Sequence, residues 1–307
     1  MPDGRAWPTI SIVVPSYQQG QFIEETLRSV LLQGYPAVEL IVIDGGSQDQ
    51  TVALLSKYSA WISYSVSEHD NGQSHAINKG FRRATGDLIG WQNSDDVYYA
   101  GAFRRAAETM MALPGVDIVY GQTQMINADG QFLASGTDSS FAPEKMVPWI
   151  NMHNQAMFLR RRVLQAGHFI DESFHHCMDV DFFWRLILSQ YSFQFIPELF
   201  AGLREHAAAK GSRQYVVAAN EYRRVYAALA RDSSVPAHIR QQAIQSLIMW
   251  AHANFAKDHI ELFREDVATI WGLNKAAALK LSLLAKLVLS LGPKRVLRLY
   301  HRFMDRG

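Results

Sequence analysis

Three short apolar runs, each followed by a polar turn, constrain the fold of this chain more than any other feature of its sequence. Residues 9–14 and 38–43 are rich in β-branched side chains, and residues 88–91 form a third apolar run. Continuous runs of this length predict buried strands. Between the first two, apolar residues recur at helical spacing over residues 22–31. This alternation predicts a parallel sheet with helices on its faces.

The polar turns after the three strands lie at one edge of such a sheet, where open α/β sheets bind their ligands. These turns are residues 15–17, 44–46 and 93–96, and the last carries two adjacent carboxylates, Asp95 and Asp96. Unpaired carboxylates at the end of a buried strand are costly. A hard divalent cation is one occupant that would use them, since it binds carboxylate and phosphate oxygens together. A solvated turn is the alternative.

The rest of the chain predicts an α/β half and an all-helical half. A polar loop at 68–80 leads into a helix that ends near residue 85, and residues 121–150 form short strands and turns with a hairpin tip at 127–130. We expect one domain at 1–212 and a helical extension at 213–307. Further helices are expected at 51–58, 101–113, 179–188, 213–231, 236–256, 259–271 and 275–291, and further strands at 116–120, 156–159 and 193–196.

Composition narrows the class of protein. The chain has 307 residues and a net charge of +1, so no strong field points to nucleic acid. The single cysteine, Cys177, excludes an internal disulfide and suits a reducing compartment. The sequence shows no signal-peptide pattern and no apolar run long enough for a transmembrane helix. These features predict a cytoplasmic protein.

Several motifs resemble those of one enzyme family. Val-Pro-Ser-Tyr at 14–17, Asp-Gly-Gly-Ser-Gln-Asp-Gln-Thr at 44–51 and Gly-Trp-Gln-Asn-Ser-Asp-Asp at 90–96 are similar to family 2 glycosyltransferases, over about residues 9–210. The resemblance implies the GT-A fold, a Rossmann-like and mostly parallel sheet. It also implies an inverting transferase that moves a sugar from a nucleotide-diphosphate sugar to a hydroxyl of a glycan or lipid-linked acceptor, in cell-surface polysaccharide biosynthesis.

The resemblance also implies a donor site at the edge of the sheet. Asp96 matches a residue that binds Mn²⁺ or Mg²⁺, and His206 a further metal or phosphate ligand. Asp95 would face the ribose or the water shell of the metal. A surface or packed histidine is the alternative for His206, and a solvated loop for the residues of 68–80. The other implied nucleotide-binding residues are Pro15, Ser16, Tyr17, Asp44, Gln73, Ser74 and Lys79.

On the acceptor side, Asp179 matches an acid that opens a helix and serves as catalytic base. Asp181 is the competing residue, because side chains two positions apart on a helix do not face the same way. Either acid could instead stabilise a helix N-terminus. The resemblance further places His153, Asn154 and Gln155 in the acceptor-side wall, with ordinary strand-edge polarity as the alternative.

Two other functions remain open at this point. One is a non-catalytic protein that binds nucleotide sugars or glycans. The other is a sugar nucleotidyltransferase. Such an enzyme requires a glycine-rich, arginine-containing loop after the first strand, and this chain has Pro-Ser-Tyr-Gln-Gln there instead.

The end of the chain is basic: residues 275–307 hold eight Lys or Arg and one acid. On a helix, Lys275, Ser282, Lys286 and Ser290 fall within about 60° of one another, and Leu and Ala fill most of the rest. Such a tail could lie on the inner face of an anionic membrane. Packing against the catalytic domain and a dimer contact are the alternatives.

Overall fold

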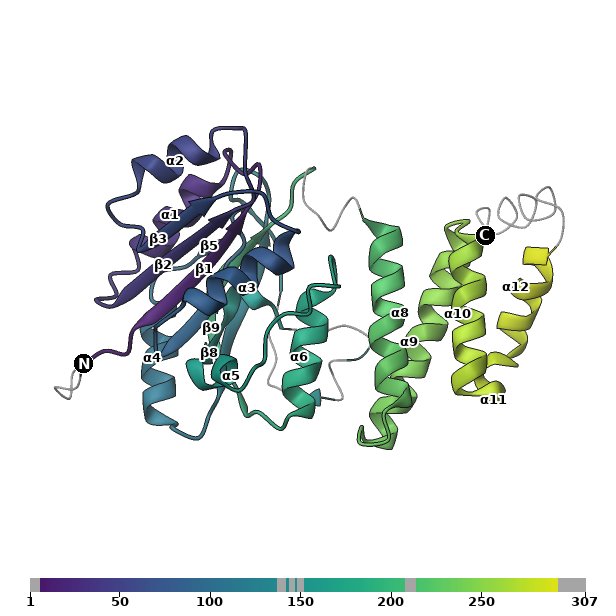
Figure 1. The fold of residues 1–307 in the computed structure, drawn as a ribbon. Coiled ribbons are helices and arrows are strands. Elements are labelled where there is room, and N and C mark those ends of the chain that lie inside the picture. Colours follow the sequence, from purple (N-terminus) through teal and green to yellow (C-terminus); the bar gives the residue numbers. More distant parts are fainter. Residues whose placement is uncertain (1–5, 137–141, 144–146, 148–151, 208–213, 292–307) are drawn as a thin grey trace. The chain divides into compact units, whose positions relative to one another are not determined.

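The computed structural model describes residues 6–136, 142–143, 147, 152–207 and 214–291. The chain divides into two compact units, drawn in Figure 1. Unit 1 comprises Met1–Ala142 and Ile150–Arg213, and unit 2 comprises Pro143–Trp149 and Gln214–Gly307. The main boundary therefore lies one residue beyond the expected end of the first domain, and a short internal segment also falls in the helical unit.

Unit 1 is built on a nine-stranded mixed sheet in the order β3-β2-β1-β4-β8-β6-β9-β5, with β7 paired to β6. The parallel block predicted from the apolar runs is confirmed: β1 (Ile10–Ser16) pairs in parallel with β2 (Val38–Asp44) and with β4 (Leu88–Trp91). In this register Ser16 lies opposite Asp44. The carboxyl ends of β1, β2 and β4 therefore meet at one edge of the sheet, as expected.

Helices cover both faces of this block, which is why its strands carry apolar side chains on both sides. Ile12 of β1 belongs to a core cluster with side chains of α1 (Ile23–Leu31) and α4 (Ala102–Ala112). The next residue, Val13, faces α3 (Gln73–Arg83), where a Cβ built on Gly80 would lie 2.2 Å from its Cγ1.

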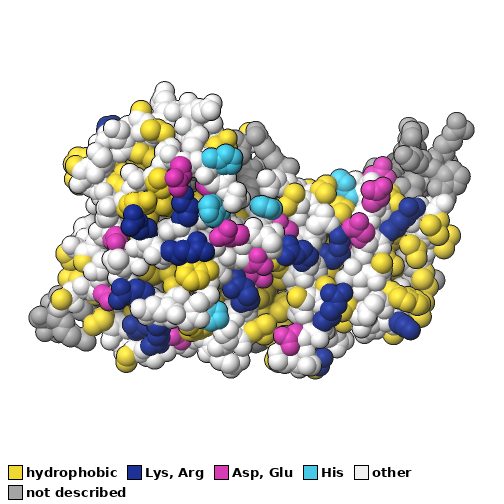
Figure 2. Space-filling view, viewed as in Figure 1, with side chains coloured by type: hydrophobic (Ala, Val, Ile, Leu, Met, Phe, Trp, Pro, Cys, Tyr) yellow, Lys and Arg dark blue, Asp and Glu magenta, His cyan; other side chains and the backbone are white. Residues whose placement is uncertain are grey.

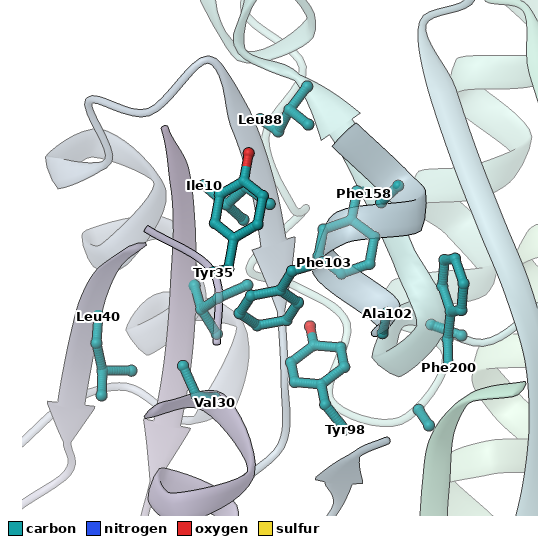
Figure 3. Close-up of a cluster of buried hydrophobic side chains, with 14 of the residues drawn as sticks. Ile10, Val30, Tyr35, Leu40, Leu88, Tyr98, Ala102, Phe103, Phe158 and Phe200 are labelled. Carbon is teal, nitrogen blue, oxygen red and sulfur yellow. The ribbon is translucent and has the colours of Figure 1, made fainter. Parts of the chain in front are cut away.

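Aromatic rings fill the centre of the core cluster (Figure 3). The Phe103 ring from α4 lies 5.6 Å from Phe158 and 4.9 Å from Tyr98. Phe200 contacts Phe158 from a third strand. These rings join the parallel strands to the second half of the sheet.

The second half of the sheet contains longer strands than the sequence predicts. β6 runs over Ile118–Ile126 and β9 over Phe193–Arg204. Pro197 cannot donate to the ladder, and the register of the pair shifts near Gly121. There a Cβ would lie 2.2 Å from the ring of Phe200, so the close approach requires glycine.

The remaining elements of unit 1 are short. The predicted hairpin tip at 127–130 joins β6 to β7. The strands are β3 (Tyr64–Ser67), β5 (Val97–Tyr98), β7 (Phe132–Ser135) and β8 (Met157–Arg160). The helices are α2 (Thr51–Lys57), the 3-10 turn η2 (Asn154–Ala156), α5 (Arg161–Gln165) and α6 (Met178–Leu188).

Unit 2 is helical, with α8 (Tyr215–Arg231), α9 (Ala237–Ala256) and α10 (Ile260–Leu273) as its long helices. The last predicted helix is instead two, α11 (Lys275–Ala278) and α12 (Leu281–Leu291). The side chain of Asn274 caps α11 by accepting from the Ala277 N–H. Among the residues that the structure describes, none of the helices has the length and apolar character needed to span a bilayer.

Candidate functional site

The ends of β1 and β2 form the first part of the site. Asp44 is buried, and its carboxylate accepts the Ser47 N–H (2.8 Å) and the hydroxyls of Ser47 (2.5 Å) and Ser67 (2.6 Å). These bonds fold the turn after β2, so the contact predicted between Asp44 and a nucleoside base stays a prediction. The buried Ser16 hydroxyl has no partner among the described residues, and Tyr17 is exposed.

The acidic turn after β4 holds its two carboxylates in different surroundings. Asp96 is buried and accepts three hydrogen bonds, from the Arg204 N–H (2.7 Å), Gln155 Nε2 (2.7 Å) and Asn93 Nδ2 (3.0 Å). Burial, together with the charge of Asp95, raises the pKa of Asp96 to about 7. Both oxygens of this carboxylate are therefore used inside the protein.

Protein donors occupy three of the roughly four lone-pair positions of this carboxylate, so the metal-binding role predicted for Asp96 stays a prediction. The predicted place of Gln155 in the acceptor-side wall also stays a prediction, because the contact described for its side chain is the one to Asp96. Gln155 and Asn154 are buried in η2, beneath the acidic turn, where Asn154 Nδ2 donates to the Trp91 carbonyl (3.4 Å). His153 contacts the Thr123 hydroxyl (3.0 Å), and desolvation lowers the pKa of its ring to about 4.

Asp95 has a different partner. Its Oδ2 lies 3.0 Å from His206 Nε2, although the two residues are 111 positions apart. The Phe22 ring packs on the imidazole with its centroid 4.5 Å away, which fixes the ring in place. His206 therefore contacts the acidic turn through Asp95, and its role as a metal or phosphate ligand stays a prediction.

Asp95 and His206 are hydrogen-bonded to each other, and their spacing is compatible with a shared cation. The 3.0 Å between Asp95 Oδ2 and His206 Nε2 is a hydrogen-bond distance, and it also matches the spacing of about 3 Å between two neighbouring ligands of an octahedral ion at about 2.1 Å. The described residues contain no group of three His, Cys, Asp or Glu that could hold an ion. A cation with few protein ligands completes its shell with water and substrate phosphate oxygens, as Mg²⁺ does beside one or two carboxylates.

Arg204, which the sequence analysis did not single out, holds this turn in place. Its side chain is 1% exposed and its guanidinium lies 5.2 Å from the Phe22 ring centroid. It donates to four acceptors on three separate segments. These are the carbonyls of Asp95 (2.8 Å), Asn127 (3.2 Å) and Ala128 (2.8 Å) and the carboxylate of Glu25 (2.6 Å).

Three of the implied nucleotide-binding residues, Gln73, Ser74 and Lys79, lie on α3. Gln73 Nε2 donates to Asn93 Oδ1 (2.9 Å), so the start of α3 touches the acidic turn. The buried Ser74 hydroxyl donates to the Phe174 carbonyl (2.6 Å), and Lys79 forms an ion pair with Glu68. The side chains of Ser74 and Lys79 are therefore engaged by the protein, and their implied nucleotide-binding role stays a prediction.

The two candidate bases lie in the first turn of α6. Asp181 forms an ion pair with Arg185 (2.8 Å), whose guanidinium also donates to the Phe169 carbonyl (2.8 Å). Asp179 accepts the N–H of Val180 (2.9 Å) and is partly exposed. Because Met178 contacts Ser74 of α3, the start of α6 is tied to the helix that touches the acidic turn. The choice of Asp179 over Asp181 stays a prediction.

Comparison with known proteins supplies an independent view of this arrangement. Residues 11–186 match the sequence profile of Glycosyl transferase family 2. An uncharacterized glycosyltransferase of Rickettsia prowazekii is 28% identical over 209 residues, which cover 66% of this chain and 65% of the relative. The chain thus matches slightly less than two thirds of that relative's length. A putative teichuronic acid biosynthesis glycosyltransferase of Bacillus subtilis, TuaG, is 34% identical over 107 residues, 34% of this chain and 42% of TuaG.

Solved structures share the fold at low identity. The crystal structure of S. aureus TarS 1–349 in complex with UDP-GlcNAc has a TM-score of 0.69 at 16% identity, covering 88% of this chain and 82% of TarS. The mannosyltransferase PcManGT from Pyrobaculum calidifontis, in complex with GDP-Man and Mn²⁺, has a TM-score of 0.59 at 18% identity, covering 97% of this chain and 87% of its own. The expected GT-A fold is confirmed.

Proposed function

Because the chain belongs to glycosyltransferase family 2, we propose that it moves a sugar from a nucleotide-diphosphate sugar to a hydroxyl of a glycan or lipid-linked acceptor, with inversion at the anomeric carbon. The observation that carries this proposal is the pairing of Asp95 with His206 beside the carboxyl ends of β1, β2 and β4. The nucleotide sugars bound to TarS and PcManGT support the donor class. The name of TuaG supports a role in cell-surface polysaccharide biosynthesis.

In this proposal the donor lies along the edge of the sheet. Asp95 and His206 would hold Mn²⁺ or Mg²⁺, and the bound ion would neutralise charge on the leaving diphosphate. Asp96 acts indirectly, since its bonds to Arg204 and Gln155 fix the turn that carries Asp95. The nucleoside is proposed to lie against Pro15, Ser16, Tyr17 and the turn at Asp44.

Asp179 is the proposed catalytic base. A carboxylate at the start of α6 would accept the proton of the acceptor hydroxyl as that oxygen attacks the anomeric carbon, a step worth about 10²–10⁴ in rate. The ion pair between Asp181 and Arg185 would hold the helix that presents Asp179. The tie from Ser74 to the segment before α6 would keep donor and acceptor sides in register.

We further propose that the reaction occurs in the cytoplasm, at the inner face of the membrane when the acceptor is lipid-linked. The single cysteine, Cys177, is buried and forms no disulfide within the chain, which suits that compartment.

The experiment is a donor screen with Mn²⁺ or Mg²⁺ present. UDP-, GDP-, CDP- and dTDP-sugars are each incubated with the protein and a panel of glycan and polyprenyl-phosphate acceptors, and release of nucleotide diphosphate is measured. We expect release from one donor, dependent on acceptor and lost on chelation. Donor binding without turnover for every acceptor would favour a non-catalytic binding protein. Formation of nucleotide sugar from a nucleoside triphosphate and a sugar phosphate would favour a nucleotidyltransferase.

A further inference from the structure

The last helix of unit 2 faces its neighbours with its polar side. Lys286 of α12 donates to His252 of α9 (2.9 Å), and its ammonium lies 5.4 Å from the Phe255 ring centroid. Ser290, one turn further on, is buried and contacts Arg264 of α10. Two residues of the polar stripe predicted from the sequence, Lys286 and Ser290, are therefore used for packing inside unit 2, whereas Lys275 and Ser282 are exposed.

The opposite side of α12 is apolar and exposed. Val288 is 70% exposed and Leu291 is 72% exposed, and their spacing places them on one face of the helix. Leu279, in the break between α11 and α12, and Trp271, near the end of α10, are also about half exposed. Figure 2 shows hydrophobic side chains gathered over this end of unit 2, with basic side chains beside them. Because Lys286 packs inward while Val288 and Leu291 are exposed, this face of the helix is suited to binding a partner or a lipid surface.

The charges near this face indicate whether it binds a second copy of the chain or a lipid surface. Between Asp266 and Asp305 the sequence holds Lys and Arg but no acidic residue. Lys275 and Lys280 are exposed on either side of Leu279, and the Lys275 ammonium lies 6.0 Å from the Trp271 ring centroid. A second copy of the chain would bring these like charges together. An anionic lipid surface would instead attract them, at about 1 kcal/mol for each cation near the surface.

We propose that the outer face of α11 and α12, together with Trp271, docks this protein on an anionic membrane surface. Val288 and Leu291 would enter the boundary between headgroups and acyl chains, where tryptophan is also favoured. The eleven residues of α12 span about 16 Å, too short to cross a hydrocarbon core of about 30 Å. The helix would thus lie in the interface. This inference does not depend on the proposed catalytic activity.

The test is flotation of the full chain with vesicles, without donor or acceptor. Vesicles of phosphatidylcholine with about 30% phosphatidylglycerol are compared with pure phosphatidylcholine vesicles at low and high salt. We expect binding only to the anionic vesicles, weakened by salt. Val288→Ser with Leu291→Ser should lower the partition coefficient at least tenfold, because both side chains are exposed and contribute apolar area only on docking. Lys275→Gln with Lys280→Gln should lower it to a smaller extent.

A matched control is Leu32→Ser with Val52→Ser, which removes two exposed apolar side chains from unit 1 and should leave binding unchanged. Circular dichroism checks that all variants fold. Failure of the intact chain to float with anionic vesicles would overturn the proposal, as would equal binding by the Val288/Leu291 variant. A concentration-dependent dimer that the same variant dissociates, without vesicle binding, would assign the face to a second copy instead. Each result is obtained whether or not the protein transfers a sugar.

Discussion

The two adjacent carboxylates of the acidic turn perform different tasks. Asp96 is buried and accepts three protein donors, whereas Asp95 meets the imidazole of His206 at 3.0 Å. From the residues alone, a bound cation and a solvated turn are both open for these acids, and only the family resemblance predicts that one of them binds a ligand. The residues alone do not predict which one, since the donors to Asp96 come from residues up to 108 positions away.

Arg204 offers a direct test of how the turn is held. Arg204→Lys removes a planar group that binds several carbonyls at once, which an ammonium cannot replace. We expect the free energy of unfolding to fall by about 2–4 kcal/mol, because buried carbonyls lose their charged donor. Transfer activity should fall as well. Chemical denaturation and initial rates measure the two effects.

The control for this substitution is Glu25→Gln. It removes only the exposed end of the same network, so the free energy of unfolding should change by less than about 1 kcal/mol. An Arg204→Lys protein as stable and active as the control would contradict the positioning role.

The two acids of α6 are separated by a second pair of substitutions. Asp179→Asn should lower kcat by about 10²–10⁴ and leave donor affinity unchanged, because only the proton acceptor is lost. Asp181→Asn should mainly lower stability, since it breaks the ion pair with Arg185. Steady-state kinetics and isothermal titration with the donor provide the readouts. Loss of turnover in Asp181→Asn, with Asp179→Asn active, would reverse the assignment.

Among the helices and strands, the sequence predicts those that are set by residues close together in the chain. The apolar runs of β1, β2 and β4 and their common edge follow from composition and alternation, because both faces of these strands are covered. The length of β9 does not follow, because its later residues pair with β6 across a shifted register. Arg204 is the last residue of β9, beyond the strand expected at 193–196. The sequence therefore did not predict that Arg204 holds the acidic turn.

The helices of unit 2 are joined by a polar network whose stability depends on pH. Asp266 is fully buried and contacts Asn254 (2.7 Å) and Arg223 (3.1 Å). Burial raises the pKa of Asp266 to about 6 from a reference of 3.8. The folded state therefore binds this proton more tightly than the unfolded chain does. The contribution to stability is complete below about pH 4 and is lost as pH rises through about 6.

Asp266→Asn keeps a neutral group at this position at every pH. The free energy of unfolding of the natural chain, minus that of the variant, should fall by up to about 3 kcal/mol between pH 4 and pH 7. Urea denaturation at a series of pH values measures this difference. A difference that is constant with pH, or that grows as pH rises, would contradict the raised pKa.

At the scale of the whole molecule, a near-neutral chain separates into units of different character. Unit 1 carries the paired groups of the proposed reaction. Unit 2 ends in a segment with basic but no acidic residues over most of its last forty positions. The sequence predicts this charge asymmetry and the amphipathic pattern of the last helix. It does not predict that the polar side of α12 packs inward, because that depends on His252 and Arg264, which lie on other helices.

Asp95 is proposed to bind the metal ion and Asp96 to hold the turn in place, and Mn²⁺ binding tests this difference most directly. Titration of each variant, followed by electron paramagnetic resonance of the free ion, is combined with chemical denaturation. Asp95→Asn should lower Mn²⁺ affinity at least tenfold and destabilise the protein less than Asp96→Asn does, because the Asn amide oxygen can still accept a hydrogen bond from His206. Asp96→Asn should destabilise the protein by about 2–3 kcal/mol, and its folded fraction should still bind the ion. A stable Asp96→Asn protein that has lost Mn²⁺, beside an Asp95→Asn protein that binds it normally, would contradict the account.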